Sequence, residues 1–191
     1  ENRANTLEVK FEPKVILYAG SLKKIYGISR LVDAFISLDM PFWELYVYGD
    51  GDYKNDLLKV SQLHSNVKYM GIRPNSEIVE AEERATILVN PRPTDEEYTK
   101  YSFPSKNMEY MASGTPLLTT KLPSMPCEYI DYVFFFDDET IEGMTNTLRH
   151  VFRLPSHELH QKGLKAKEFV LHEKNNKVQA RKIVELIQRL E

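Results

Sequence analysis

The chain has 191 residues, which is enough for one ordinary domain that buries a core without disulfide or metal staples. A formal net charge of −3 argues against the broad basic field that nonspecific nucleic-acid binding requires, so we expect no nucleic-acid partner. The lone Cys127 excludes an internal disulfide framework and favours a cytoplasmic location. No apolar run reaches the roughly 18 residues that span a bilayer. Because the chain starts at Glu1 rather than Met, we expect it to be a piece of a longer protein.

Short apolar runs alternate with amphipathic patterns along the first half of the chain. In chain order, they predict a strand at 15–19, a helix at 28–36, a strand at 43–49, a helix at 52–63, a strand at 67–71, a helix at 74–85 and a strand at 86–90. A proline-rich loop over 91–104 follows, longer than most connections in compact domains.

The second half begins with a helix at 104–113, followed by strands at 116–120 and 132–136, and helices fill the remainder. The last helix is expected to place these apolar residues on one face: Ala180, Ile183, Val184, Ile187 and Leu190. The whole pattern predicts an α/β fold, a doubly wound, Rossmann-like parallel sheet of about six strands with helices on both faces. Ligands bind beyond the carboxyl ends of such strands. The loops expected to form that rim are those at Gly20, Gly49, Gly71, Pro91 and Phe103.

The stretch from Ser102 to Glu109 is typical of a helix that begins at an anion. Pro104 fits a first turn, where its missing N–H would be unpaired anyway, and Ser102 or Ser105 offers a hydroxyl. The free amides of a helix start suit a phosphate, and Lys106 adds a full positive charge. Glu109 follows on the same face, where its carboxylate can accept hydrogen bonds from vicinal hydroxyls. A phosphate beside a ribose is therefore indicated.

A plain structural role fits the same residues. Pro104 and Ser105 would then simply begin a helix, Glu109 would pair with Lys106 at the surface, and Gly114 would be an ordinary C-cap.

The sequence indicates no metal site. His157 and His160 have the spacing of ligands on one helical face, but nothing completes a set, and an exposed helix start with Ser156 as N-cap explains them better. Asp137 and Asp138 read as a solvated turn at a strand end.

The segment FPSKNMEYMASGTPLLT resembles one in the retaining family 4 glycosyltransferases of the GT-B fold. There a Glu, seven residues and a second Glu precede a run of small residues, a Gly, any residue and a Pro. Three more segments resemble the family in its order and spacing: YAGSLKKIYGISRLVDAF, VYGDGDYKNDL and VKYMGIRPNSEIVEAEERATILVNP. Together they extend over most of the chain.

This resemblance implies that 1–191 is a single donor-binding domain, the C-terminal half of a two-domain transferase. The full protein would move a sugar from a nucleotide diphosphate sugar to an acceptor, a polysaccharide or glycolipid, with retention and without cofactor or metal. Its partners would be an N-terminal acceptor-binding domain and, peripherally, a membrane. The isolated domain is expected to bind nucleotide weakly and to transfer nothing. Two alternatives stay open. One is a noncatalytic nucleotide-sugar-binding module. The other is an unrelated doubly wound domain such as a signalling receiver, although this chain lacks the early acidic cluster that receivers use.

The resemblance also implies roles for individual residues. Glu109 would hold the ribose hydroxyls, 103–106 would face the diphosphate and sugar, Gly20 would let its loop approach the donor, and 71–73 would read the base. The residues expected to bind the donor are Gly20, Ser21, Lys24, Gly71, Ile72, Arg73, Arg92, Tyr101, Ser102, Phe103, Pro104, Ser105, Lys106 and Glu109, of which Lys106 and Glu109 are also expected to act in catalysis.

Two departures from the family stand out. The position of its first Glu is occupied by Tyr101, and the sequence leaves open whether Glu96 or Glu97 replaces that carboxylate. The two usual basic positions fall at Ser21 and Tyr26. The cations available to neutralise the diphosphate instead are Lys23, Lys24, Arg92 and Lys106.

Overall fold

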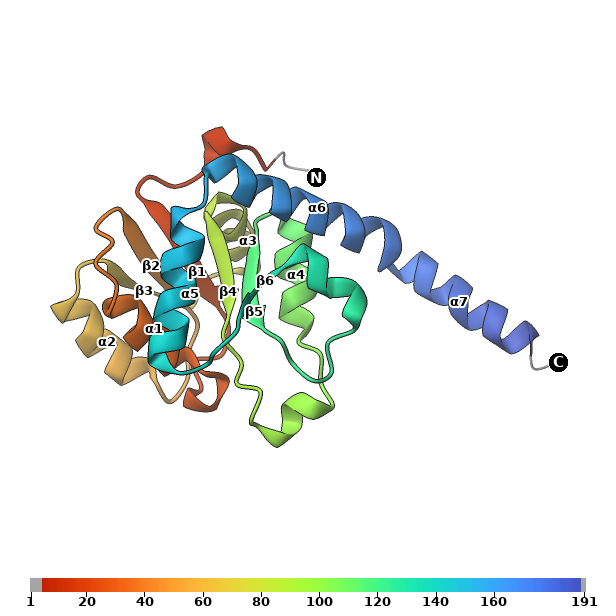
Figure 1. Cartoon of the computed structure of the whole chain (residues 1–191), viewed down its shortest axis with the longest axis horizontal. Helices are drawn as coiled ribbons and strands as arrows, with labels where there is room; N and C mark the ends of the chain where they lie inside the picture. The colour runs from red at the N-terminus through yellow and green to blue at the C-terminus, as the bar shows by residue number, and fades with distance from the viewer. Residues whose placement is uncertain (1–4, 190–191) are drawn as a thin grey trace.

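A six-stranded parallel sheet lies between two layers of helices in the computed structural model, which describes residues 5–189 (Figure 1). The strand order is β3-β2-β1-β4-β5-β6. The strands are β1 (Lys14–Ala19), β2 (Trp43–Tyr48), β3 (Val67–Gly71), β4 (Ile87–Asn90), β5 (Leu117–Thr120) and β6 (Phe134–Phe136). All five pairings between neighbours are parallel, which confirms the predicted fold class.

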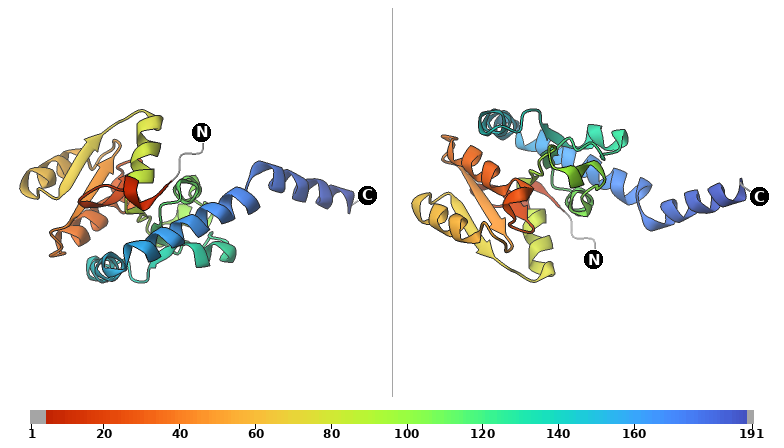
Figure 2. Two further views of the ribbon diagram at one scale, coloured as in Figure 1. Left: turned by 90° about the horizontal axis from the view of Figure 1, so that it is seen from above. Right: turned by 90° about the horizontal axis from the view of Figure 1, so that it is seen from below.

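Helices cover both faces of this sheet, as Figure 2 shows from above and below. The helices are α1 (Ile28–Ile36), α2 (Lys54–Leu63), α3 (Asn75–Arg84), α4 (Ser105–Ser113), α5 (Ile141–Arg153), α6 (Ser156–Glu173) and α7 (Asn176–Gln188). One core cluster joins the sheet to α1, α2 and α5, and a second joins its other face to α3, α4 and α6.

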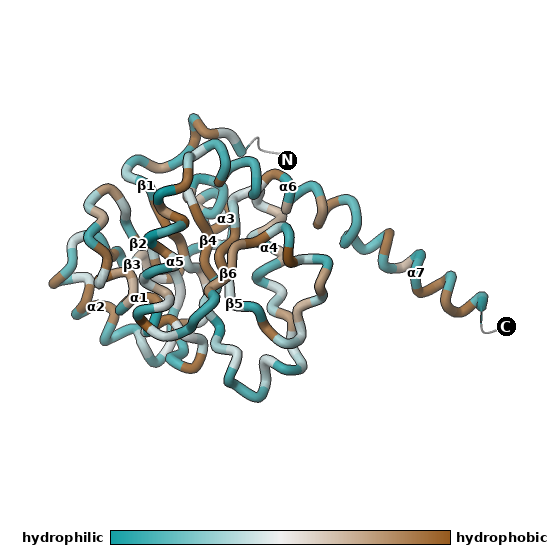
Figure 3. Tube along the Cα trace, viewed as in Figure 1, coloured by the Kyte–Doolittle hydropathy of each residue, from teal (hydrophilic) through white to brown (hydrophobic). Residues whose placement is uncertain are grey.

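The central strand β1 supplies side chains to both cores. Ile16 and Tyr18 belong to the first cluster, whereas Val15, Leu17 and Ala19 belong to the second. Because successive side chains of a strand point to opposite faces, a strand covered on both sides must be apolar throughout. Figure 3 shows this hydrophobic centre. The continuous apolar run of this strand is therefore explained, as predicted, by burial on both faces of the sheet.

The strand order reverses between β1 and β4, which pair with each other. Beyond the carboxyl ends of two such strands a doubly wound sheet opens a crevice. The neighbouring loop after β2 approaches so closely that a Cβ at Gly49 (φ +127°) would lie 1.8 Å from the Gly20 carbonyl oxygen. Only glycine fits there. The Gly49 amide in turn donates to the Gly71 carbonyl at 2.9 Å, so the Gly20, Gly49 and Gly71 loops do share one rim.

Element boundaries differ from the predicted ones at a few places. The strand predicted at 132–136 is shorter because Cys127–Tyr132 forms a 3-10 helix that continues to its edge. The long loop contains another 3-10 helix, Glu97–Lys100. The N-cap of α6 is Pro155, so the expectation that Ser156 is the cap was wrong.

The last helix, α7, extends away from the sheet (Figure 1) and has no buried residue. Its apolar residues Ile183, Val184 and Ile187 are exposed, while Leu190, predicted on the same face, lies outside the described residues. Over the part of the chain that the structure describes, no helix has the length and apolar character needed to cross a bilayer.

The close approach of the Gly20 and Gly49 loops allows the effect of two substitutions on stability to be predicted. Gly49→Ala places a methyl group against the Gly20 carbonyl at a positive φ, so we expect it to lower the free energy of unfolding by about 3 kcal/mol. Gly71→Ala is the matched control: its φ is also positive, at +73°, but nothing lies within 4 Å, and about 1 kcal/mol is expected. Urea denaturation measures both. Equal losses would contradict the role of the close approach.

Candidate donor-binding site

The start of α4 lies on the rim, next to the crevice. Pro104 is its N-cap, with φ −65°, and makes no side-chain capping bond. The exposed Ser105 is the first helical residue. Since the first amides of a helix have no partner within it, this end offers N–H donors and a partial positive charge to an anion. The helix ends as predicted, at Gly114 with φ +82°.

A pocket of about 260 Å³ lies where the loops after β1, β2 and β3 meet α4. Its lining residues are Ala19, Gly20, Tyr48, Gly49, Ile72, Arg73, Asn75, Ile78 and Lys106. Four residues predicted for the donor site thus line one pocket, although the loops that carry them are far apart in sequence: Gly20, Ile72, Arg73 and Lys106.

A larger hollow, of about 660 Å³, lies beside the first turn of α5. It is lined by Arg30 and by four carboxylate residues: Asp95, Asp137, Asp138 and Glu139. Because carboxylates repel an anion, this hollow suits a diphosphate less well than the smaller pocket with its two cations.

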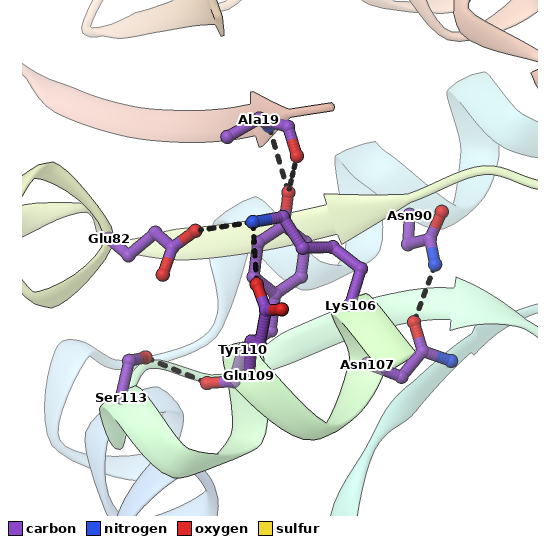
Figure 4. Close-up of polar contacts among 8 residues, drawn as sticks. All are labelled: Ala19, Glu82, Asn90, Lys106, Asn107, Glu109, Tyr110 and Ser113. Atoms are coloured by element: carbon purple, nitrogen blue, oxygen red, sulfur yellow. Dashed lines mark hydrogen bonds and ion pairs between the residues drawn. The ribbon is translucent and has the colours of Figure 1, made fainter. Parts of the chain in front are cut away.

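Lys106 is held between two carboxylates (Figure 4). Its Nζ lies 2.8 Å from Glu109 Oε2 and 3.3 Å from Glu82 Oε1. Burial lowers the pKa of Lys106, but the hydrogen bond to Glu109 and the charges of both carboxylates outweigh burial, so the pKa lies above its ordinary value. Lys106 is therefore a cation at neutral pH. The surface pair of Lys106 and Glu109 that the sequence allowed is present, with Glu82 as a partner that the sequence did not predict.

Tyr110 attaches α4 to the end of β1. Its hydroxyl donates to the Ala19 carbonyl at 3.0 Å and accepts from the Ala19 amide at 2.8 Å (Figure 4). The side chain is fully buried, and burial raises the pKa of Tyr110 well above its ordinary value. The hydroxyl therefore stays protonated and can make both bonds.

A second attachment joins α4 to the neighbouring strands. The buried Asn90 Nδ2, at the end of β4, donates to Asn107 Oδ1 at 2.6 Å. The Asn90 carbonyl accepts from Thr119 Oγ1 of β5 at 2.9 Å. The first bond fixes the first turn of α4 to the end of β4, and the second links that strand end to β5.

The other predicted cations lie elsewhere on the rim. Lys24 pairs with Asp56 of α2 at 2.7 Å. The Arg92 guanidinium lies 4.4 Å from the centre of the Tyr26 ring and 5.8 Å from that of Tyr98. Neither lines the pocket.

Ser102 and Phe103 directly precede α4, while Ser21 lies in the loop after β1. The Ser102 hydroxyl donates to the Tyr98 carbonyl at 3.0 Å, and Phe103 packs against Tyr129 with ring centres 4.9 Å apart. The Ser21 carbonyl accepts from the Tyr18 hydroxyl at 2.8 Å. Tyr101 is 83% exposed, so its side chain lies outside the core.

Sequence reasoning missed several residues of this site. Tyr48, Asn75 and Ile78 line the pocket, while Glu82 and Tyr110 hold it in shape. The sequence gives a weak signal for two of them: Tyr48 directly precedes the predicted rim glycine Gly49, and Asn75 lies at the start of a predicted helix. No local signal marks Glu82 or Tyr110, because their partners are distant in the chain. Among the described residues no group of three or more His, Cys, Asp or Glu side chains is arranged to hold a metal ion.

The sequence profile of the family described as Glycosyl transferases group 1 matches residues 13–153, well over half of the chain. The chain belongs to this family of glycosyltransferases. No curated protein sequence gives a significant match.

Several solved structures share the fold. Sucrose-phosphate synthase from Thermosynechococcus elongatus superposes with a TM-score of 0.74 at 17% identity, over 93% of this chain and 45% of that one. Alr3699/HepE from Anabaena, in complex with UDP and glucose, gives 0.71 at 18% identity, over 92% and 48%. The C-terminal domain of the group 1 protein LpcC from Francisella tularensis gives 0.69 at 18% identity, over 85% and 87%. This chain thus spans less than half of the first two and most of the third.

The attachment of α4 makes a second prediction. Tyr110→Phe leaves both backbone groups of Ala19 without their hydroxyl partner, and we expect a loss of about 2 kcal/mol in the free energy of unfolding. Tyr98→Phe removes only a 3.4 Å bond to the exposed Ile25 carbonyl, so a change within about 0.5 kcal/mol is expected. Denaturant titration of both variants is the measurement, and a Tyr110→Phe protein as stable as wild type would contradict the attachment.

Proposed function

We propose that this chain is the donor-binding domain of a retaining transferase that moves a hexosyl group from a nucleotide diphosphate sugar to an acceptor, a polysaccharide or glycolipid. The observation that carries the proposal is the pocket beyond the carboxyl ends of β1, β2 and β3, which is lined by Arg73 and by Lys106 from the first turn of α4. The Anabaena protein of the same fold is described in complex with UDP and glucose.

The donor would lie across this pocket. The amides of Ser105 and Lys106 and the Lys106 ammonium would face the diphosphate, with Gly20 beneath it. Glu109 would accept hydrogen bonds from the ribose hydroxyls, and 71–73 would contact the base. Of the four cations considered for the diphosphate, Lys106 has the strongest support, because it lines the pocket while Lys24 pairs with Asp56.

Arg92 has a supporting part in this proposal. Its guanidinium stacks on Tyr26, the position where related transferases usually place a lysine. We propose that it neutralises charge from the sugar side of the site, near Tyr98, where an acceptor would approach.

In the proposed reaction, a hydroxyl oxygen of the acceptor forms a bond to the anomeric carbon while the bond from that carbon to the diphosphate oxygen breaks. The acceptor proton leaves with the diphosphate, and the new bond forms on the face that the old one left. Amides and cations fixed before the reaction stabilise the charge that develops on the leaving group. Holding the acceptor hydroxyl next to the leaving diphosphate, on the same face of the sugar, supplies the rest. We propose that this needs no metal ion.

We further propose that a second, N-terminal domain supplies the acceptor side and that the intact protein is cytoplasmic, with peripheral membrane contact. The fraction of the two longer neighbours that the chain spans, 45% and 48%, supports a second domain. The second candidate function is a noncatalytic nucleotide-sugar-binding module. The exposed Tyr101, in place of the first Glu of related transferases, favours that alternative.

Ligand binding and turnover test the proposal in the intact protein. UDP-, GDP- and ADP-sugars are screened by thermal shift, and the donor that stabilises the protein most is used in transfer assays. We expect one donor to raise the melting temperature and to be consumed when acceptor is added. Binding without transfer would favour the noncatalytic module, and stabilisation by none of the three would reject both functions.

Lys106 gives a sharper test of the same proposal. We expect Lys106→Ala to weaken binding of the selected donor about tenfold, because a charge-assisted contact to the diphosphate is lost. Lys24→Ala, at a cation paired with Asp56 outside the pocket, is expected to leave affinity within about twofold. Isothermal titration calorimetry measures both. Unchanged affinity and turnover in Lys106→Ala would remove Lys106 from the donor site.

A further inference from the structure

A buried carboxylate lies behind the proposed donor pocket. The Glu82 side chain, in the last turn of α3, is only 3% exposed and is not part of the pocket wall. Its Oε1 lies 3.3 Å from Lys106 Nζ. Figure 4 shows the carboxylate directed toward the ammonium. The side chains become more exposed from Glu82 outward: Lys106 is 27% exposed and Glu109 is 57% exposed. An ammonium at the pocket wall is thus held from inside the protein as well as from its surface.

The two carboxylates differ in how firmly they can hold Lys106. An exposed pair three residues apart on a helix contributes little, because water and salt screen it and both side chains lose freedom. A buried carboxylate strongly favours keeping a partner, because a charge left alone away from water is costly. Burial accordingly raises the pKa of Glu82, and the Lys106 charge acts against that rise. Glu82 is therefore the firmer of the two anchors.

The hydrogen-bonding capacity of the ammonium gives this arrangement a use. Lys106 has three N–H donors, and two are directed to Glu82 and Glu109. If the proposed donor takes Glu109 through its ribose hydroxyls, Lys106 keeps Glu82 and has two donors for phosphate oxygens. Without Glu82, the ammonium would have Glu109 as its sole carboxylate, and the ribose would compete with Lys106 for it.

We infer that Glu82 is a positioning residue for the donor site: it holds the Lys106 ammonium at the pocket wall and so releases Glu109 to the ribose of a nucleotide diphosphate sugar. This inference rests on the proposed function. It assigns a role to a residue that touches no substrate and acts only through its neighbour.

The sign of the effect on binding separates this role from a plain charge effect. Glu82 is an anion near an anion site, so removing its charge alone would strengthen diphosphate binding. Loss of positioning weakens binding instead. A purely structural role would lower stability and leave the recognition of the ribose hydroxyl as it is.

The test measures binding of a nucleoside diphosphate and its 2′-deoxy analogue to the intact protein by calorimetry. The probe is whichever of UDP, GDP and ADP the wild type binds most tightly. In wild type, we expect removal of the 2′-hydroxyl to weaken binding about tenfold, as for a hydrogen bond to a charged group. In Glu82→Gln, we expect the parent ligand to bind about fivefold more weakly and the 2′-deoxy penalty to fall to about twofold.

Glu83→Gln is the matched control, because it removes the same charge one residue further along α3. We expect it to leave the affinity and the 2′-deoxy penalty at their wild-type values. If Glu82→Gln does not fold, as judged by its thermal melt, Glu82→Asp takes its place. Aspartate keeps the charge but withdraws the carboxylate by one methylene, so positioning predicts the same two changes and a charge effect predicts neither.

The outcomes separate this inference from the function on which it rests. Tighter or unchanged binding in the folded variant, or a 2′-deoxy penalty as large as in wild type, overturns the role of Glu82 and leaves the proposed function intact. Failure of the wild type to bind any of the three diphosphates overturns both.

Discussion

The hydroxyl group of Tyr110 fixes the geometry on which the candidate site depends. It satisfies both the amide and the carbonyl of Ala19, the last residue of β1, at 2.8 and 3.0 Å. A strand end without a ladder partner would otherwise leave buried polar groups unsatisfied, and each of these costs free energy. One side chain of α4 therefore completes the central strand and sets the distance from the helix to the Gly20 loop. The helix α4 and the end of β1 next to the Gly20 loop keep their relative places for this reason.

The buried bonds around α4 contrast with the contacts further out on the rim. The bond between Asn90 and Asn107 ties the same helix to β4, within a fully buried setting. Arg92, by comparison, lies on the rings of Tyr26 and Tyr98, in loops with partly exposed side chains. Local opening is easiest where few buried contacts hold the chain. The start of α4, where we propose that the phosphates bind, is therefore held more firmly than the loop that carries Arg92.

The sequence was sufficient for those features that depend on neighbours in the chain. Continuous apolar strands follow from a sheet covered on both faces, and the proximity of Lys106 and Glu109 follows from helical spacing. Features that depend on the packing of distant segments were out of reach. Glu82 is 24 residues from Lys106, and Ala19 is 91 residues from Tyr110, so only the assembled fold brings them together. The false expectation for Ser156 has a local cause: two residues, Pro155 and Ser156, both suit a helix start, and the proline takes the cap position.

The contact between Gly20 and Gly49 has a consequence for how the specificity of such a domain can change. Where the two loops meet, the pocket floor consists of main chain, because no side chain fits at Gly49. Main-chain amides and carbonyls are the same in every residue, so substitutions cannot alter the chemistry of this floor. Changes in ligand preference are expected from the walls, whose side chains include Ile72, Arg73, Asn75 and Lys106. The pocket therefore has a main-chain floor that substitutions change little and side-chain walls that a few substitutions can change.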